Sequence, residues 1–122
     1  MRFLLDSTAY VAWVLGLRFD RAARRRIERS GAAVSAVTVY ELDHKAARGK
    51  VRLPATVAEG IAEFGFRALD VTARHAARAA RLPTLHHDPM DRLLIAQAQM
   101  EDMTVVTRDV IFDAYDVAVV TF

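Results

Sequence analysis

HHDPMDRLLIAQAQMEDMTVVTRD, residues 86–109, is the stretch that most clearly indicates the fold of this chain. Asp88 and Pro89 are typical of a helix start, because aspartate accepts hydrogen bonds from free backbone N–H groups and proline suits the first turn. An apolar helix without a breaker follows, and a polar turn ends it. The β-branched residues 104–107 are typical of a buried parallel strand. The stretch therefore predicts a helix followed by a strand, a unit found in α/β folds.

The same alternation of strands and helices recurs along the whole chain. Short strands are expected at residues 2–5, 32–36, 66–69, 104–107 and 117–120. Helices are expected at residues 9–15, 20–30, 37–48, 55–64, 73–81 and 89–100, with one further turn at 110–113. This order predicts an α/β fold with a mainly parallel sheet and right-handed crossovers, because parallel neighbours need a crossover connection.

The composition is that of a globular protein. With 122 residues, 53% hydrophobic and 26% charged, the chain is expected to form a single domain over residues 1–122. No run of about 20 apolar residues predicts a membrane span, and the start does not resemble a signal peptide. The absence of cysteine excludes disulfides and thiolate metal sites and favours a cytoplasmic location. The net charge of +2 is too small to indicate nucleic-acid binding by itself.

Acidic residues follow the predicted strands or begin the next helix. Asp6, Glu41, Asp91 and Asp109 all have this placement, and side chains beyond the carboxyl ends of parallel strands line the ligand crevice of such sheets. Each acid also has a simpler explanation as a helix cap. For Glu41 that explanation is a capping box with Thr38, which lies three residues before it.

Four carboxylates at one edge are harder to explain as caps, because like charges repel unless something neutralises them. The cation that oxygen-only ligands favour is Mg²⁺, with Mn²⁺ as an alternative. A divalent ion lowers the pKa of bound water and stabilises charge on a phosphoryl group. The acids therefore indicate metal-assisted phosphodiester hydrolysis.

Four stretches of the sequence carry a resemblance to a known family. LLDSTAYVAWV, SAVTVYEL, DPMDRLLIAQA and VVTRD, in this order and spacing, resemble PIN-domain proteins of the VapC toxin type over nearly the full length. The resemblance implies a three-layer α/β/α sandwich and a metal-dependent ribonuclease. It also implies a cognate antitoxin, an RNA substrate and a homodimer. By motif, the metal ligands and catalytic residues of the family correspond to Asp6, Glu41, Asp91 and Asp109.

The resemblance leaves a choice between two acids in the DPMD stretch. Asp91 matches the family better than Asp88, because the apolar helix residues follow it at the family's spacing. Asp88 is then expected to be the N-cap, with an outer-shell role at the metal as an alternative. Thr107 fits the family's polar position beside the metal.

Histidines and other folds give competing interpretations. A zinc site at His86 and His87 lacks further ligands at suitable spacing, and His44 and His75 are expected on the surfaces of helices. A non-enzymatic receiver-like or protein-interaction module also gathers acids at strand ends. A receiver, however, needs a lysine beyond a late strand, and the lysines here lie mid-chain. A PIN nuclease acting on DNA has the same acids.

Two arginine stripes are expected on helices. Arg21, Arg24, Arg25 and Arg29 share one face of the helix at 20–30, and Arg74, Arg78 and Arg81 share a face of the helix at 73–81. Such stripes usually face solvent. The alternative is contact with RNA phosphates or with an acidic segment of a partner.

Overall fold

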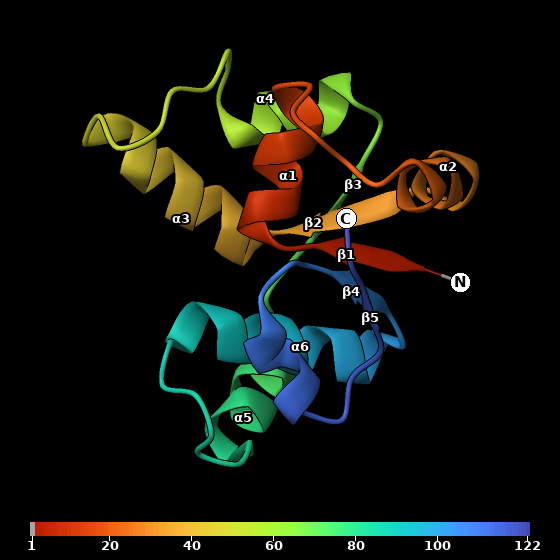
Figure 1. The fold of residues 1–122 in the computed structure, drawn as a ribbon. Helices are drawn as coiled ribbons and strands as arrows, with labels where there is room; N and C mark the ends of the chain where they lie inside the picture. Colours follow the sequence, from red (N-terminus) through yellow and green to blue (C-terminus); the bar gives the residue numbers. More distant parts are fainter. Residues whose placement is uncertain (1) are drawn as a thin grey trace.

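The computed structural model describes residues 2–122 (Figure 1). The strands are β1 (Phe3–Leu5), β2 (Ala32–Ser35), β3 (Arg67–Leu69), β4 (Thr104–Val106) and β5 (Val119–Val120). The helices are α1 (Ser7–Val14), α2 (Arg21–Ser30), α3 (Ala36–Ala47), α4 (Val57–Glu63), α5 (Ala73–Arg81) and α6 (Pro89–Glu101), followed by a 3₁₀ helix η1 (Val110–Ala114).

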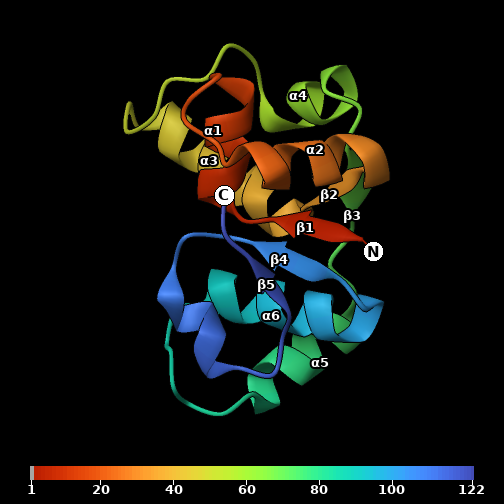
Figure 2. The same cartoon turned by 45° about the vertical axis from the view of Figure 1, so that its right-hand side comes forward.

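The five strands form one parallel sheet in the order β3-β2-β1-β4-β5. Helices α1, α2 and α4 lie on one face and α5, α6 and η1 on the other, with α3 leading away from the end of β2 (Figures 1 and 2). This arrangement confirms the predicted α/β/α sandwich. It places β1 at the centre, between β2 and β4.

Side chains of β1 alternate between the two layers, as the period of two in a strand requires. Phe3 and Leu5 pack in the cluster that includes Ile27 of α2. Leu4 packs in the opposite cluster with Leu94 and Ile95 of α6. All three β1 side chains are buried, so this strand holds the two cores together.

Helix α3 starts earlier than predicted, which changes the role of Glu41. Ser35 is the N-cap, and its Oγ accepts a hydrogen bond from the Val37 N–H at 3.0 Å. Thr38 therefore lies inside the helix, where it is buried. The predicted capping box between Thr38 and Glu41 is wrong, because Ser35 is itself a good N-cap. Glu41 lies in the second turn and its carboxylate is available for other contacts.

Three further details differ from the sequence-based expectations. Helix α4 begins only at Val57, because Thr56 and Glu59 form a capping box there. Strands β3 and β5 are shorter than predicted. The expectation that His75 lies on the surface is wrong, because only 2% of its surface is exposed. Its Nδ1 accepts from the Thr72 N–H, and its Nε2 lies 2.9 Å from Glu101 Oε2, so both nitrogens of the buried ring have partners.

A buried glutamine fixes α6 against the sheet. The Gln97 carbonyl Oε1 accepts a hydrogen bond of 2.7 Å from Ser35 Oγ, and its Nε2 donates to the Asp70 backbone carbonyl at 3.2 Å. Gln97 is fully buried. The side chain thus connects α6 to the ends of β2 and β3, and it helps to set where the first turn of α6 lies.

We expect Gln97→Leu to destabilise the protein by about 2 kcal/mol, because it leaves the buried Ser35 hydroxyl and the partly buried Asp70 carbonyl without this partner. Urea unfolding measures the loss. Gln99→Leu, on the more exposed face of the same helix, is the matched control: its hydrogen bonds with Arg78 and the Asp116 carbonyl are exposed, so water can replace them, and the free energy of unfolding should change by about 0.5 kcal/mol or less. Equal effects of the two substitutions would contradict the role of the buried network.

Candidate functional site

The candidate acids lie around the carboxyl ends of the parallel strands. Asp6 directly follows β1, and its N–H donates to the Val106 carbonyl at the end of β4. Asp109 lies three residues beyond β4, Glu41 lies on the helix that follows β2, and Asp91 lies in the first turn of α6. Since the strands are parallel neighbours, the acids reach these ends from both sides of β1.

Thr107 connects Asp6 to Asp109. Its side-chain hydroxyl hydrogen-bonds to the buried Asp6 carboxylate, and its Oγ1 accepts from the Asp109 N–H at 3.0 Å. Asp6 Oδ1 also accepts from the Ala9 N–H at 2.8 Å and from Thr8 Oγ1 at 2.9 Å. Asp6 is therefore a helix cap, as the simpler explanation expected, and it also faces a second carboxylate.

Glu41 is held between two side chains that the sequence did not suggest. Ser7 Oγ donates to Glu41 Oε2 at 3.3 Å, and Lys45 Nζ lies 2.9 Å from the same oxygen. Ser7 is adjacent in sequence to Asp6 and begins α1. The ion pair with Lys45 is partly exposed and worth at most about 1 kcal/mol. These contacts keep Glu41 next to the end of β1.

Asp91 has a histidine partner. His86 Nε2 lies 2.9 Å from Asp91 Oδ2, and both side chains are about three-quarters buried. Asp88 is the N-cap of α6, with its Oδ1 accepting from the Met90 N–H. The prediction that Asp88 caps this helix is confirmed.

The pKa values of Asp6 and Asp91 are both raised above the ordinary range of an aspartate. Burial is the main cause for Asp6, and its hydrogen bonds offset only part of the effect, while the charge of Asp109 adds to it. Burial is also the main cause for Asp91, where His86 lowers the pKa and the charges of Asp88 and Glu41 raise it. Each carboxylate thus lies within the field of another acid, a situation that a cation would relieve.

The acids form two interacting pairs rather than one closed cluster. Asp6 interacts with Asp109, and Asp91 interacts with Glu41. Across residues 2–122, the only group of three or more potential metal ligands with atoms within 4.8 Å of one another is His86, Asp88 and Asp91. The oxygen-only character of the two pairs suits a hard divalent cation.

We expect the metal-free protein to lose stability as the pH rises above about 4, because the raised pKa means that folded Asp6 binds its proton more tightly than unfolded Asp6 does. The stabilisation from this proton is fully present below the pKa of unfolded Asp6. It is lost as the pH rises through the higher pKa of folded Asp6. Asp6→Asn retains a capping oxygen and should remove this part of the decline, as melting temperatures across pH will show. Asp113→Asn, at an exposed acid, is the control. An unchanged pH profile in Asp6→Asn would contradict the assignment.

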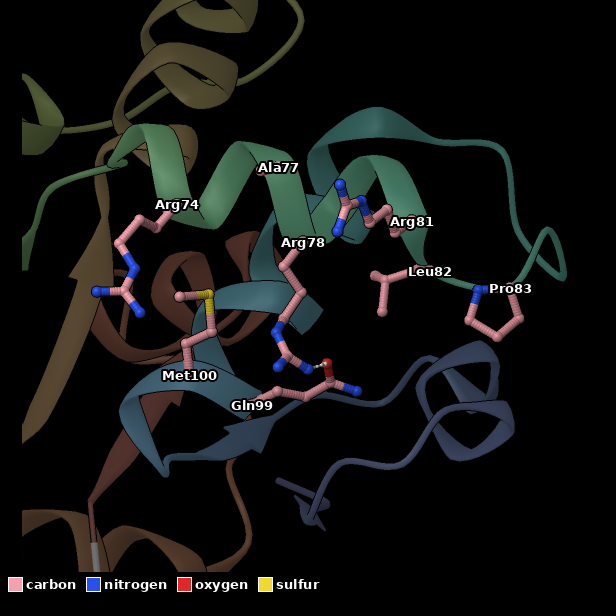
Figure 3. Close-up of a pocket in the computed structure, with 8 residues that line it drawn as sticks. All are labelled: Arg74, Ala77, Arg78, Arg81, Leu82, Pro83, Gln99 and Met100. Carbon is pink, nitrogen blue, oxygen red and sulfur yellow. Dashed lines mark hydrogen bonds between the residues drawn. The ribbon is translucent and has the colours of Figure 1, made fainter.

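A basic groove lies between α5 and α6, and none of the four acids lines it (Figure 3). Arg74, Arg78 and Arg81 of α5 line it together with Gln99 and Met100 of α6. Arg78 donates to Gln99 Oε1 at 3.1 Å. The predicted arginine stripe of α5 is therefore accessible, and it borders the loop that leads to His86.

The stripe on α2 is partly used for packing. The guanidinium of Arg24 lies 4.3 Å from the centroid of the Trp13 ring and 5.5 Å from that of Phe19. Such cation–π contacts explain why Arg24 is only partly exposed. Arg24 therefore packs against α1 and the loop that follows α1, and only part of its side chain faces solvent.

Several contacts around the acids were not predicted from the sequence. They are those of Ser7 and Lys45 with Glu41, of His86 with Asp91, and of Arg92 with the His86 carbonyl. Lys45 could have been found, because it lies four residues after Glu41 on the same helix. The contact of Ser7 with Glu41 spans 34 residues, and no local pattern reveals it.

Comparison with known proteins identifies the family. The family model of the PIN domain matches residues 3–118, so the chain belongs to the PIN domain family, whose members are nucleases. The resemblance seen in the sequence is thereby confirmed. No curated protein matches the sequence. No helix among residues 2–122 is long and apolar enough to cross a membrane.

Solved structures share the fold at low sequence identity. A chain of VapBC2 from Rickettsia felis, bound to a promoter DNA fragment, is 16% identical with a TM-score of 0.77, covering 99% of this chain and 98% of that one. A chain of DNA-bound VapBC from Salmonella typhimurium is 17% identical with a TM-score of 0.73, covering 99% and 98%. A chain of FitAcB from Neisseria gonorrhoeae is 24% identical with a TM-score of 0.66, covering 96% and 95%.

Proposed function

We propose that this chain is a Mg²⁺-dependent endoribonuclease and the toxin of a type II toxin–antitoxin pair. The observation that carries the proposal is the placement of acids beyond the neighbouring parallel strands β1 and β4 in a chain of the PIN family: Asp6 follows β1, Asp109 lies beyond β4, and Glu41 contacts Ser7 next to Asp6. The oxygen-only donor set and the mutual repulsion of the acids fit a hard cation. Mn²⁺ is an alternative to Mg²⁺ at such ligands.

In this proposal Asp6, Glu41, Asp91 and Asp109 hold the metal, and Thr107 is a positioning residue. Bound Mg²⁺ supplies an activated water and charge stabilisation at the scissile phosphate. Thr107 keeps the Asp6 carboxylate and the Asp109 backbone at a fixed spacing through its hydroxyl. Ser7 and Lys45 restrain Glu41, and His86 restrains Asp91.

The test is cleavage of total RNA with Mg²⁺, with Mn²⁺ and with excess chelator, alongside single- and double-stranded DNA. The proposal expects endonucleolytic cleavage of RNA that depends on the added metal. Cleavage of DNA alone would assign the chain to the DNA-directed nucleases of the same family. Absence of any metal-dependent cleavage by the folded protein would contradict the proposal.

We expect Mg²⁺ to raise the melting temperature, because it binds the folded state and not the unfolded one. At about 100 times the dissociation constant the gain is about 2.7 kcal/mol, which corresponds to several degrees. Asp6→Asn should reduce this shift. Equal shifts in the wild type and the variant would show that Asp6 is not part of the metal site.

A cognate antitoxin and a homodimer belong to the same proposal. The structural neighbours include chains of VapBC2 and FitAcB, and a chain of a toxin–antitoxin complex from Klebsiella pneumoniae. The receiver-like alternative has no support, because receivers use the strand order 2-1-3-4-5 whereas this sheet has 3-2-1-4-5. Light scattering of the purified chain measures the oligomeric state.

A further inference from the structure

A second cluster of ligand atoms lies at the start of α6. One ring nitrogen of His86 and one carboxylate oxygen each from Asp88 and Asp91 lie within 4.8 Å of one another. The cluster differs from the four acids in two ways. It includes an imidazole nitrogen, and two of its members, His86 and Asp88, are not in the proposed Mg²⁺ ligand set.

The spacing is close to what a small ion requires. Zinc bonds of about 2.0–2.2 Å to nitrogen and oxygen place neighbouring ligand atoms roughly 3–4 Å apart. His86 and Asp91 are already 2.9 Å apart. Modest side-chain rotation would therefore bring all the ligand atoms around one ion. Three protein ligands with open positions for water are also the usual count of an accessible zinc site.

Hydrogen bonds from the Arg92 side chain hold the backbone at His86 in place. Arg92 Nη1 donates to the backbone carbonyls of His86 and Pro83 at 3.1 and 2.9 Å. Asp88 uses its Oδ1 to cap α6 and keeps Oδ2 for another partner. His86 and Asp91 retain 25% and 23% exposure of their side chains, so an ion can enter from solvent.

We infer that His86, Asp88 and Asp91 form a binding site for a first-row transition-metal ion, for which Zn²⁺ is the probe. Imidazole suits zinc and its neighbours, whereas magnesium prefers oxygen ligands alone. If Asp91 also belongs to the proposed Mg²⁺ site, the two sites share one ligand. Zn²⁺ at His86 then competes with Mg²⁺ for Asp91 and inhibits RNA cleavage; only this consequence rests on the proposed function.

The test is calorimetric titration of Zn²⁺ into the full chain, compared with His86→Ala and Asp88→Asn. Loss of an outer-shell partner costs about 10–100-fold in metal affinity, so removal of a direct ligand should weaken Zn²⁺ binding by at least about tenfold. His87→Ala, at the exposed neighbouring histidine, is the matched control and should bind Zn²⁺ as the wild type does. Co²⁺ absorption in the visible range gives a second readout, and its spectrum should change in His86→Ala. Circular dichroism confirms that each variant is folded; if His86→Ala is not, His86→Asn replaces it.

The outcomes separate this inference from the proposed function. Equal Zn²⁺ affinity in the wild type and His86→Ala would overturn the site and leave the His86–Asp91 contact as a hydrogen bond only. Mg²⁺ titration in parallel should be weakened by Asp6→Asn, whereas Zn²⁺ binding by the same variant should still depend on His86. Zn²⁺ binding that depends on His86, in a protein without any Mg²⁺-dependent cleavage, would support this inference while the proposed function fails.

Discussion

Asp91→Asn is expected to lower RNA cleavage by about 100-fold or more while the protein stays folded. A bound divalent ion stabilises the transition state by several kcal/mol, and each 1.36 kcal/mol is about tenfold in rate. The amide keeps the shape of the side chain and an oxygen that can face His86, but it removes the charge that would hold the metal. Single-turnover cleavage of a labelled RNA at saturating Mg²⁺ measures the effect.

Asp113→Asn is the matched control, since it removes a carboxylate at an exposed position of η1. We expect its rate to lie within about twofold of the wild type, because surface substitutions away from a site have small effects. The metal-free Asp91→Asn protein should be at least as stable as the wild type, since a buried charge and its repulsion are gone. Wild-type cleavage by a folded Asp91→Asn variant would remove Asp91 from the site.

Arg92→Ala is expected to cost about 3–4 kcal/mol of stability. The Arg92 guanidinium donates to four backbone carbonyls, those of Ala79, Leu82, Pro83 and His86, and to the Tyr115 hydroxyl. A fully buried acceptor left without a donor costs about 1–3 kcal/mol, and these acceptors cost less each because they are partly buried or exposed and can turn to water. Urea unfolding at fixed pH measures the change.

Arg92→Lys tests whether geometry or charge matters at this position. A lysine ammonium has no planar fork, so it cannot reach all of these acceptors, and we expect it to restore less than half of the lost stability. Arg81→Ala, at an exposed arginine of the neighbouring helix, should cost about 0.5 kcal/mol or less. A small effect of Arg92→Ala would mean that other contacts fix the loop at residues 82–88.

Local patterns predicted the fold well because its strands and helix starts carry strong local signals. The β-branched residues of β4 and the Asp88-Pro89 start of α6 are examples. The position of Glu41 was harder to interpret, because two N-caps, Ser35 and Thr38, compete within three residues. The structure has Ser35 as the cap.

The surroundings of the acids could not be predicted, because they depend on contacts between distant residues. Ser7 meets Glu41 across 34 residues, and Arg92 meets Tyr115 across 23. His75 was misplaced for the same reason, since its partner Glu101 lies 26 residues away. The placement of the four acids at one edge followed from topology, whereas the details of each pair depend on tertiary packing.

The central position of β1 has a consequence for synthesis of the chain. Leu4 pairs with Ala33 on one side and with Val105 on the other, so one side of the first strand stays unpaired until β4 has been made. Asp6 and Asp109 can approach only after that late pairing. A ribosome-bound nascent chain that ends before β4 therefore lacks the assembled group of acids, and the proposed nuclease cannot act on nearby RNA until β4 has been synthesised.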